Sequence, residues 1–197
     1  MTYSSTEEIN NLPIDILSET DTQCTELINC TEVSNFEDCE FTSTEEVGNY
    51  LRETIPLSHL EGCPSIKYQS NLAKHNPYSC GTFYRSSQEI KIWSINESRE
   101  ELLETVTHEV GHNVHENITT NRPELATEWS EINQVSYLQN SIDGTGFVSS
   151  YAKTNEYEDF AESYAFYIVD PEALVFYSPE KYEFIKNKVF YGREYVS

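Results

Sequence analysis

One segment of the chain, residues 98–116, indicates both a local structure and a chemistry. It reads SREELLETVTHEVGHNVHE. Ser98 followed by Glu101 is typical of a capping box, and apolar residues then recur at the spacing of one helical face. These are Leu103, Val106, Val110 and Val114. The sequence therefore predicts a helix from residue 98 to about residue 116.

The predicted helix carries His108, Glu109, Gly111 and His112. Two histidines four residues apart share one face, about 6 Å apart along the axis, so both imidazoles can reach one zinc ion. Glu109 can then face a zinc-activated water, accept its proton and deliver it to the leaving amine of a peptide. Gly111 leaves a surface without a side chain, where another element can approach closely. This pattern predicts one zinc ion per chain.

A catalytic zinc usually takes three protein ligands, so the third must come from elsewhere in the chain. His115 lies off to the side of the same helix, which favours a place behind the ligands or facing solvent. His59 and His75 are isolated in the sequence. Glu158 and Glu162 are four residues apart on one face of another predicted helix. Spacing alone does not choose between these two glutamates.

The zinc motif, together with residues 151–167 (YAKTNEYEDFAESYAFY), resembles the lethal-factor-like zinc peptidases, which include the clostridial Pro-Pro endopeptidases. The resemblance implies a gluzincin-type site in which His108, His112 and Glu158 bind zinc. It also implies that Glu162 orients a histidine and that Tyr151 donates a hydrogen bond to the developing oxyanion. The extended histidine motif of the metzincins is absent.

The same resemblance covers about residues 80–169 and implies an edge strand that pairs with an extended substrate, as in an endopeptidase. The segment CGTFYRSSQEIKIW before the zinc helix is similar to that arrangement. The residues implied in substrate binding are Gly81, Thr82, Phe83 and Tyr84. A preference for Pro-Pro sequences does not follow, because no residue here can be identified as setting it.

Two other functions are open at this point. Glu61-Gly62-Cys63-Pro64-Ser65 resembles the metal-binding cysteine segment of peptide deformylases, which would make Cys63 the third ligand. Against it, a proline stands where those enzymes have leucine, and Gly111 stands where they have aspartate. The chain could also be a non-catalytic, metal-containing binding protein. Glu109 argues against that function, because a structural zinc site needs no acid-base carboxylate.

Other segments predict the remaining elements. Alternating apolar and polar residues predict strands, and apolar residues at helical spacing behind capping residues predict helices. The strands are expected at 64–69, 81–86 and 89–95, with a hairpin turn at 86–88. Further helices are expected at 43–55, from residue 123 to a loop at 143–146, at 155–169 and at 178–189. Residues 1–42 are polar and acidic with three cysteines, and are interpreted as an irregular N-terminal arm.

Length and charge limit the remaining choices. A chain of 197 residues suits one domain, which we expect to be a monomer. A formal net charge of −22 disfavours nucleic-acid and membrane partners and favours basic peptide or protein substrates. No signal peptide or transmembrane segment is recognisable, so a soluble protein is expected, and the five cysteines favour a reducing compartment.

The sequence as a whole predicts an α+β, zincin-like metallopeptidase domain over residues 43–197. It should have a small twisted mixed sheet, an active-site helix and a helical C-terminal part. The expected reaction is hydrolysis of peptide bonds, with Glu109 as general base and acid.

Overall fold

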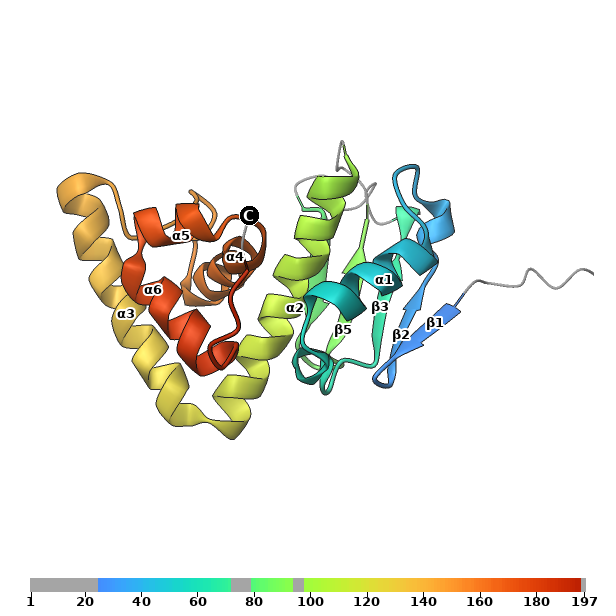
Figure 1. Ribbon diagram of the computed structural model, residues 1–197, viewed down its shortest axis with the longest axis horizontal. Helices are drawn as coiled ribbons and strands as arrows, with labels where there is room; N and C mark the ends of the chain where they lie inside the picture. Colours follow the sequence, from blue (N-terminus) through green and yellow to red (C-terminus); the bar gives the residue numbers. More distant parts are fainter. Residues whose placement is uncertain (1–24, 72–78, 94–97, 196–197) are drawn as a thin grey trace, which may run out of the picture.

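The computed structural model describes residues 25–71, 79–93 and 98–195. In these residues the chain forms a mixed sheet and a set of helices, which confirms the predicted α+β class. Figure 1 shows the sheet and α1 (Thr44–Thr54) on one side of α2 (Arg99–Asn121), and the C-terminal helices on the other side. The predicted zinc helix therefore lies at the centre of the molecule.

The sheet has five strands in the described residues, in the order β1-β2-β3-β5-β4. They are β1 (Thr25–Ile28), β2 (Thr31–Ser34), β3 (Ser65–Tyr68), β4 (Gly81–Tyr84) and β5 (Glu89–Ile92). The three central strands β2, β3 and β5 are parallel, and the outer strands β1 and β4 pair antiparallel to their neighbours. The sheet is thus mixed, and β4 forms the edge next to the second half of the chain.

The three predicted strands correspond to β3, β4 and β5, each shorter than expected by a few residues. The predicted turn is confirmed: the backbone N–H of Gln88 donates to the Tyr84 carbonyl at 2.7 Å. Gln88 has a φ of 53°, a left-handed conformation that reverses the chain within the hairpin. Residues 94 and 95 of the third predicted strand lie outside the described residues.

The interpretation of residues 1–42 as irregular is wrong for the described part, residues 25–42. Strands β1 and β2 form a hairpin there, and β2 extends the sheet by pairing with β3. The turn residues Asn29 and Cys30 have φ values of 47° and 70°, which suit a two-residue hairpin turn. Cysteine in place of the usual glycine hides this signal in the sequence. Residues 1–24 lie outside the described residues.

The remaining helices follow the predicted boundaries in part. They are α3 (Pro123–Asp143), α4 (Glu156–Val169), α5 (Pro171–Tyr177) and α6 (Pro179–Phe184), with a π-helical turn at Ile185–Val189. Ser43, Ser98 and Asn155 cap the N-termini of α1, α2 and α4 through their side chains. Helix α2 continues five residues beyond the predicted end, and α5 was not predicted. None of the described helices is both long and apolar enough to cross a membrane.

Helices α2 and α4 approach each other closely at Gly111. A Cβ atom at this position would lie 3.0 Å from the Cα of Ala161 and 3.2 Å from the Cβ of Tyr164. Both contacts are closer than real Cβ atoms usually make, so only glycine fits without a shift. This confirms the role predicted for Gly111, and it brings the side chains of α4 within reach of the histidines on α2.

Candidate metal centre

Helix α2 presents His108 and His112 side by side. Their ring centroids are 4.8 Å apart and the rings are nearly perpendicular. The Nε2 atoms of both rings point at one carboxylate oxygen, Oε2 of Glu158, at 3.1 Å from His108 and 3.2 Å from His112. One ligand atom from each of the three residues can be chosen so that all lie within 4.8 Å of one another. Nitrogen and oxygen donors at this spacing can hold a zinc ion.

Glu162 lies one turn after Glu158 on α4 and contacts the other side of His108. Nδ1 of His108 donates a hydrogen bond to Oε1 of Glu162 at 2.9 Å, and the hydroxyl of Ser149 donates to Oε2 at 2.5 Å. Spacing in the sequence left the two glutamates equivalent, and the structure separates them. Glu158 faces both Nε2 atoms, whereas Glu162 faces only the outer nitrogen of one ring.

The electrostatics of this cluster favour a cation. Burial alone would lower the pKa of His108, but its hydrogen bonds to Glu158 and Glu162 outweigh burial and raise that pKa to about 10. Burial would also raise the pKa of Glu158, yet hydrogen bonds to His108 and His112 hold it well below its usual range. The site thus stabilises positive charge between the two helices, as a metal site must.

Glu109 lies beside the cluster and is turned towards the sheet edge. Its side chain is almost completely enclosed, with 5 % of the residue exposed. The backbone of Phe83 hydrogen-bonds to its carboxylate, and Oε1 lies close to Gly81, where a Cβ would come within 2.8 Å. Within the described part of the chain Oε2 has no hydrogen-bond partner. Burial raises the pKa of Glu109, which suits a carboxylate that takes up and releases a proton.

Tyr151 approaches the same cluster from the loop before α4. Its ring centroid is 5.9 Å from that of His108, and 51 % of the residue is exposed. Partial burial, together with the carboxylates of Glu158 and Glu109, raises the pKa of Tyr151 to about 12. The phenol therefore keeps its proton at neutral pH and can act as a hydrogen-bond donor.

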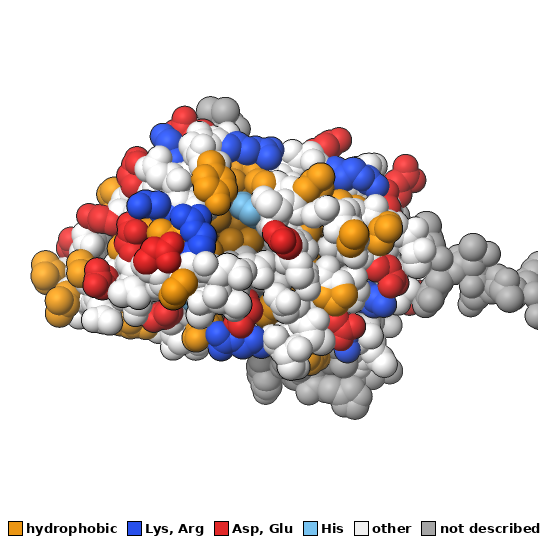
Figure 2. Space-filling view, turned by 90° about the horizontal axis from the view of Figure 1, so that it is seen from below, with side chains coloured by type: hydrophobic (Ala, Val, Ile, Leu, Met, Phe, Trp, Pro, Cys, Tyr) orange, Lys and Arg blue, Asp and Glu red, His pale blue; other side chains and the backbone are white. Residues whose placement is uncertain are grey.

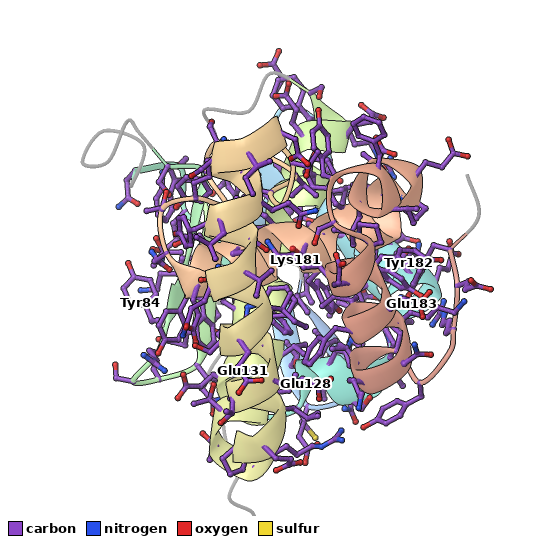
Figure 3. The ribbon with its side chains drawn as sticks, turned by 90° about the vertical axis from the view of Figure 1, so that its left-hand side faces the viewer. Tyr84, Glu128, Glu131, Lys181, Tyr182 and Glu183 are labelled. Carbon is purple, nitrogen blue, oxygen red and sulfur yellow. The ribbon has the colours of Figure 1, made fainter. Side chains whose placement is uncertain are left out.

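The four predicted substrate-binding residues make up strand β4, at the outer edge of the sheet. One side of β4 pairs with β5, and no described strand pairs with its other side. The ring of Phe83 stacks over that of His112, with centroids 6.4 Å apart, while Tyr84 is exposed at the margin of the molecule (Figure 3). The strand thus runs alongside the metal-capable cluster, with an outer edge that no described strand covers and on which the Phe83 backbone bonds to Glu109.

The other described histidines, His115 and His59, are buried and are not part of the metal-capable cluster. For His115, the predicted placement facing solvent is wrong. The residue is buried and its ring stacks on that of Phe160, with ring centroids 4.6 Å apart. His59, isolated in the sequence, bonds through Nδ1 to the hydroxyl of Tyr164 at 2.8 Å inside the core. His75 lies outside the described residues.

The deformylase-like alternative finds no support in the position of Cys63. Its thiol is buried just before β3, 3.5 Å from the carbonyl oxygen of Ser65, and it is not part of the metal-capable cluster. Burial raises the pKa of Cys63 to about 12, so the thiolate needed for zinc binding is disfavoured. The third donor that the structure brings to the histidines is Glu158 instead.

An open cleft of about 420 Å³ adjoins His108, Glu109, Tyr151 and Glu162. The predicted substrate-binding residue Gly81 also lines this cleft. The residues that complete the lining were not predicted from the sequence: they are Glu101, Glu104 and Thr105 from the first half of α2, and Ser79 and Cys80 from the segment leading into β4. Helical spacing could have predicted Glu101, Glu104 and Thr105, because positions 101, 104, 105 and 108 share one face of α2.

These features together define a class of protein. Two histidines four apart on one helix, a glutamate from a second helix and an adjacent edge strand are the arrangement expected of a zinc metallopeptidase. Residues 65–187 match the family described as "Putative zinc-binding metallo-peptidase", and the chain belongs to this family. No curated protein matches the chain. Family membership supports a zinc-dependent peptidase, while the likeness to the lethal-factor-like enzymes stays a prediction.

Proposed function

We propose that the protein is a zinc-dependent endopeptidase in which His108, His112 and Glu158 bind one zinc ion. The observation that carries the proposal is the combination of three convergent donors with Glu109, whose buried carboxylate has an unpartnered oxygen beside them. A purely structural zinc site has no use for such a carboxylate. Zinc held by these residues would supply a Lewis acid that polarises the scissile carbonyl and acidifies water.

The surrounding residues would orient the ligands and move the proton. Glu162 accepts a hydrogen bond from Nδ1 of His108, which leaves the Nε2 lone pair directed at the metal position. Glu109 would accept the proton of the attacking water and pass it to the leaving amine, a double role that its raised pKa favours. The phenol of Tyr151 would donate a hydrogen bond to the carbonyl oxygen as negative charge develops there.

Strand β4 supports internal cleavage of an extended substrate. A peptide that paired with the outer edge of Gly81–Tyr84 would lie along the cluster, with its backbone held by main-chain hydrogen bonds. Such pairing needs chain on both sides of the scissile bond, as an endopeptidase requires. The gluzincin-type site and the likeness to the lethal-factor-like peptidases belong to this proposal, without any Pro-Pro preference.

Long-range charge supports cationic substrates. The formal net charge of −22 attracts basic peptides, although the face shown in Figure 2 carries basic as well as acidic side chains. Because exposed charges act through solvent, the attraction should weaken as salt is raised. We propose that the enzyme works as a monomer on peptides or proteins, and not on nucleic acid or membranes.

The test combines metal analysis with cleavage of a peptide library. Wild-type protein should hold about one zinc per chain, Glu158→Gln should lose most of it, and Cys63→Ser, the matched test of the alternative ligand, should keep it. Glu109→Gln should retain zinc and lower kcat by about 10²- to 10⁴-fold, because only the proton transfer is removed.

The alternative functions predict different results. Zinc lost in Cys63→Ser but retained in Glu158→Gln would favour the deformylase-like site. Stoichiometric zinc in a wild-type protein that cleaves no peptide of the library would contradict the peptidase proposal and favour a metal-containing binding protein.

A further inference from the structure

Helix α3 carries an exposed apolar stripe outside the proposed active site. Val135, Leu138 and Ile142 are 59 %, 69 % and 83 % exposed, respectively. Residues three and four positions apart share one helical face, so these side chains form a continuous stripe along the second half of α3. In Figure 2 hydrophobic side chains gather at the left-hand end of the molecule, the end at which α3 finishes in Figure 1. Apolar residues scattered singly are normal on a surface, but a contiguous set marks a site of interaction.

An apolar groove adjoins this stripe, between α3 and the start of α6. Its volume is about 190 Å³, and α3 contributes Ile132 and Val135 to its lining. Figure 3 shows α3 and α6 next to each other on this side of the molecule. Because Val135 belongs to both the stripe and the groove, the two features form one surface. This surface, made of Val135, Leu138, Ile142 and the groove, is called the α3 surface below.

The stripe is half of a longer repeat that is typical of packed helices. Positions 124, 128, 131, 135, 138 and 142 alternate spacings of four and three residues, as in the seam along which one helix packs against another. The first three positions are glutamates and the last three are apolar. Five of these six residues are exposed and Glu128 is partly exposed, so no described element covers this face. The face therefore has room for a second helix along α3.

The charges around the α3 surface favour a basic occupant. Glu131 of α3 and Glu180 of α6 line the groove, and no lysine or arginine is among its described lining residues. Neither carboxylate forms an ion pair or a side-chain hydrogen bond with the described residues. Helix α3 itself contains no lysine or arginine. Lys181, next to Glu180 in the sequence, is buried and bonded to Asp159.

Charge also distinguishes the molecules that could cover this surface. A second copy would bring another acidic chain against it, and with a formal net charge of −22 per chain the two copies repel each other. An anionic lipid surface is repelled for the same reason. A helix that carries lysines or arginines beside an apolar stripe complements both the apolar residues and the two glutamates.

We propose that the α3 surface is a docking site for a basic amphipathic helix of a partner protein. Apolar side chains of the partner would cover Val135, Leu138 and Ile142 and enter the groove, while its lysines or arginines would lie opposite Glu131 and Glu180. The inference does not depend on the proposed peptidase function, because no residue of α3 belongs to the metal-capable cluster.

The experiment selects binders from a displayed library of designed helices. Each helix has apolar residues at alternating spacings of three and four, and each flanking position is randomly lysine, glutamate or glutamine. The target is the whole chain with Glu109→Gln and bound zinc, so that cleavage does not deplete the library. Selected helices should carry lysine at the flanking positions about 10-fold more often than glutamate. Selection without this enrichment would overturn the proposal.

Substitutions on the α3 surface locate the selected helices. Leu138→Ser and Glu131→Lys should each raise the dissociation constant of a selected helix about 10-fold, measured by fluorescence anisotropy. Leu27→Ser is the matched control for the first, because Leu27 of β1 is 70 % exposed. Glu45→Lys, at an exposed position of α1, makes the same change of charge as Glu131→Lys. Neither control should alter the constant. An equal change in a substitution and its control would mean that the helices bind elsewhere and would overturn the proposal.

Two further measurements test the other occupants. The wild type should sediment as a monomer, and a dimer that Leu138→Ser dissociates would overturn the proposal and assign the α3 surface to a second copy of the chain. The wild type should also not co-sediment with phosphatidylcholine vesicles. Vesicle binding that Leu138→Ser abolishes would assign the surface to lipid instead. None of these results depends on whether the protein cleaves peptides, so a failed peptidase test leaves this inference standing and the reverse also holds.

Discussion

At the scale of single residues, His115 is a buried group whose chemistry differs from that of its neighbours on α2. Only 1 % of the residue is exposed, its ring stacks on Phe160, and neither ring nitrogen has a hydrogen-bond partner in the described residues. Burial lowers the pKa of His115 to about 4. His115 is therefore neutral in the folded protein at neutral pH, and its two unsatisfied ring nitrogens lower the unfolding free energy.

This predicts an acid-sensitive contribution to stability. In the unfolded chain the histidine pKa is about 6.5, so between pH 6.5 and pH 4 the unfolded state binds a proton that the native state does not. The contribution of neutral, buried His115 to the unfolding free energy is therefore present above pH 6.5 and is lost progressively as the pH falls towards 4. From pH 7 to pH 5 the wild type should lose about 2 kcal/mol more unfolding free energy than His115→Leu. Urea unfolding of both proteins in a chelator measures this, and equal losses would contradict it.

Residue-level chemistry was the most predictable part of the candidate site. Placing His108 and His112 side by side on a capped helix required no knowledge of the fold, because residues four positions apart lie on the same helical face. Sequence spacing could not decide whether Glu158 or Glu162 is the third ligand, because this depends on how α4 is rotated against α2. The surroundings of His115 were also unpredictable, because burial is set by elements far along the chain.

At the scale of elements, strong periodic signals predicted well and short elements did not. Helices α1, α2 and α4 combine capping residues with an apolar stripe, and all three were expected near their observed positions. Strands β1 and β2 have four residues each, too few for alternation to stand out, and they are stabilised by pairing with each other and with β3. The seven-residue helix α5 is likewise stabilised by its neighbours more than by its own sequence.

The contact between α2 and α4 gives a prediction at this scale. Gly111→Ala would press a methyl group against the backbone of Ala161, which cannot move without displacing α4. Overpacking of this kind costs about 1–3 kcal/mol, and here it would also move Glu158 away from the two histidines. We expect at least a 10-fold loss of zinc affinity together with a lower unfolding midpoint, measured by competition with a chelator and by urea unfolding.

Thr120→Ala, at an exposed position of α2, is the control for introducing alanine into this helix. It should change neither property appreciably. Unchanged zinc affinity in Gly111→Ala would mean that the two helices can separate without disturbing the ligands.

At the scale of the whole molecule, a buried ion pair joins the C-terminal helices. Nζ of Lys181, on α6, donates hydrogen bonds to Oδ1 of Asp159 at 2.6 Å and to the Gly146 carbonyl at 2.5 Å. Oδ2 of Asp159 accepts a hydrogen bond from Asn133 of α3 at 2.8 Å. Figure 3 shows Lys181 among the C-terminal helices, and both charged side chains are fully buried. The pair was not predicted from the sequence, because Asp159 and Lys181 are 22 residues apart and lie on different helices.

The pair supports the site because Asp159 directly follows Glu158 on α4. Lys181→Met would leave the Asp159 carboxylate buried without its cation, which should cost about 3–5 kcal/mol of unfolding free energy. Adding Asp159→Asn removes the unpaired charge, so the double variant should be more stable than Lys181→Met alone. Urea unfolding measures these differences, and chelator competition should show weaker zinc binding in the single variant. A double variant whose loss equals the sum of the two single losses would show that the charges do not interact, and that α4 is held in place by packing alone.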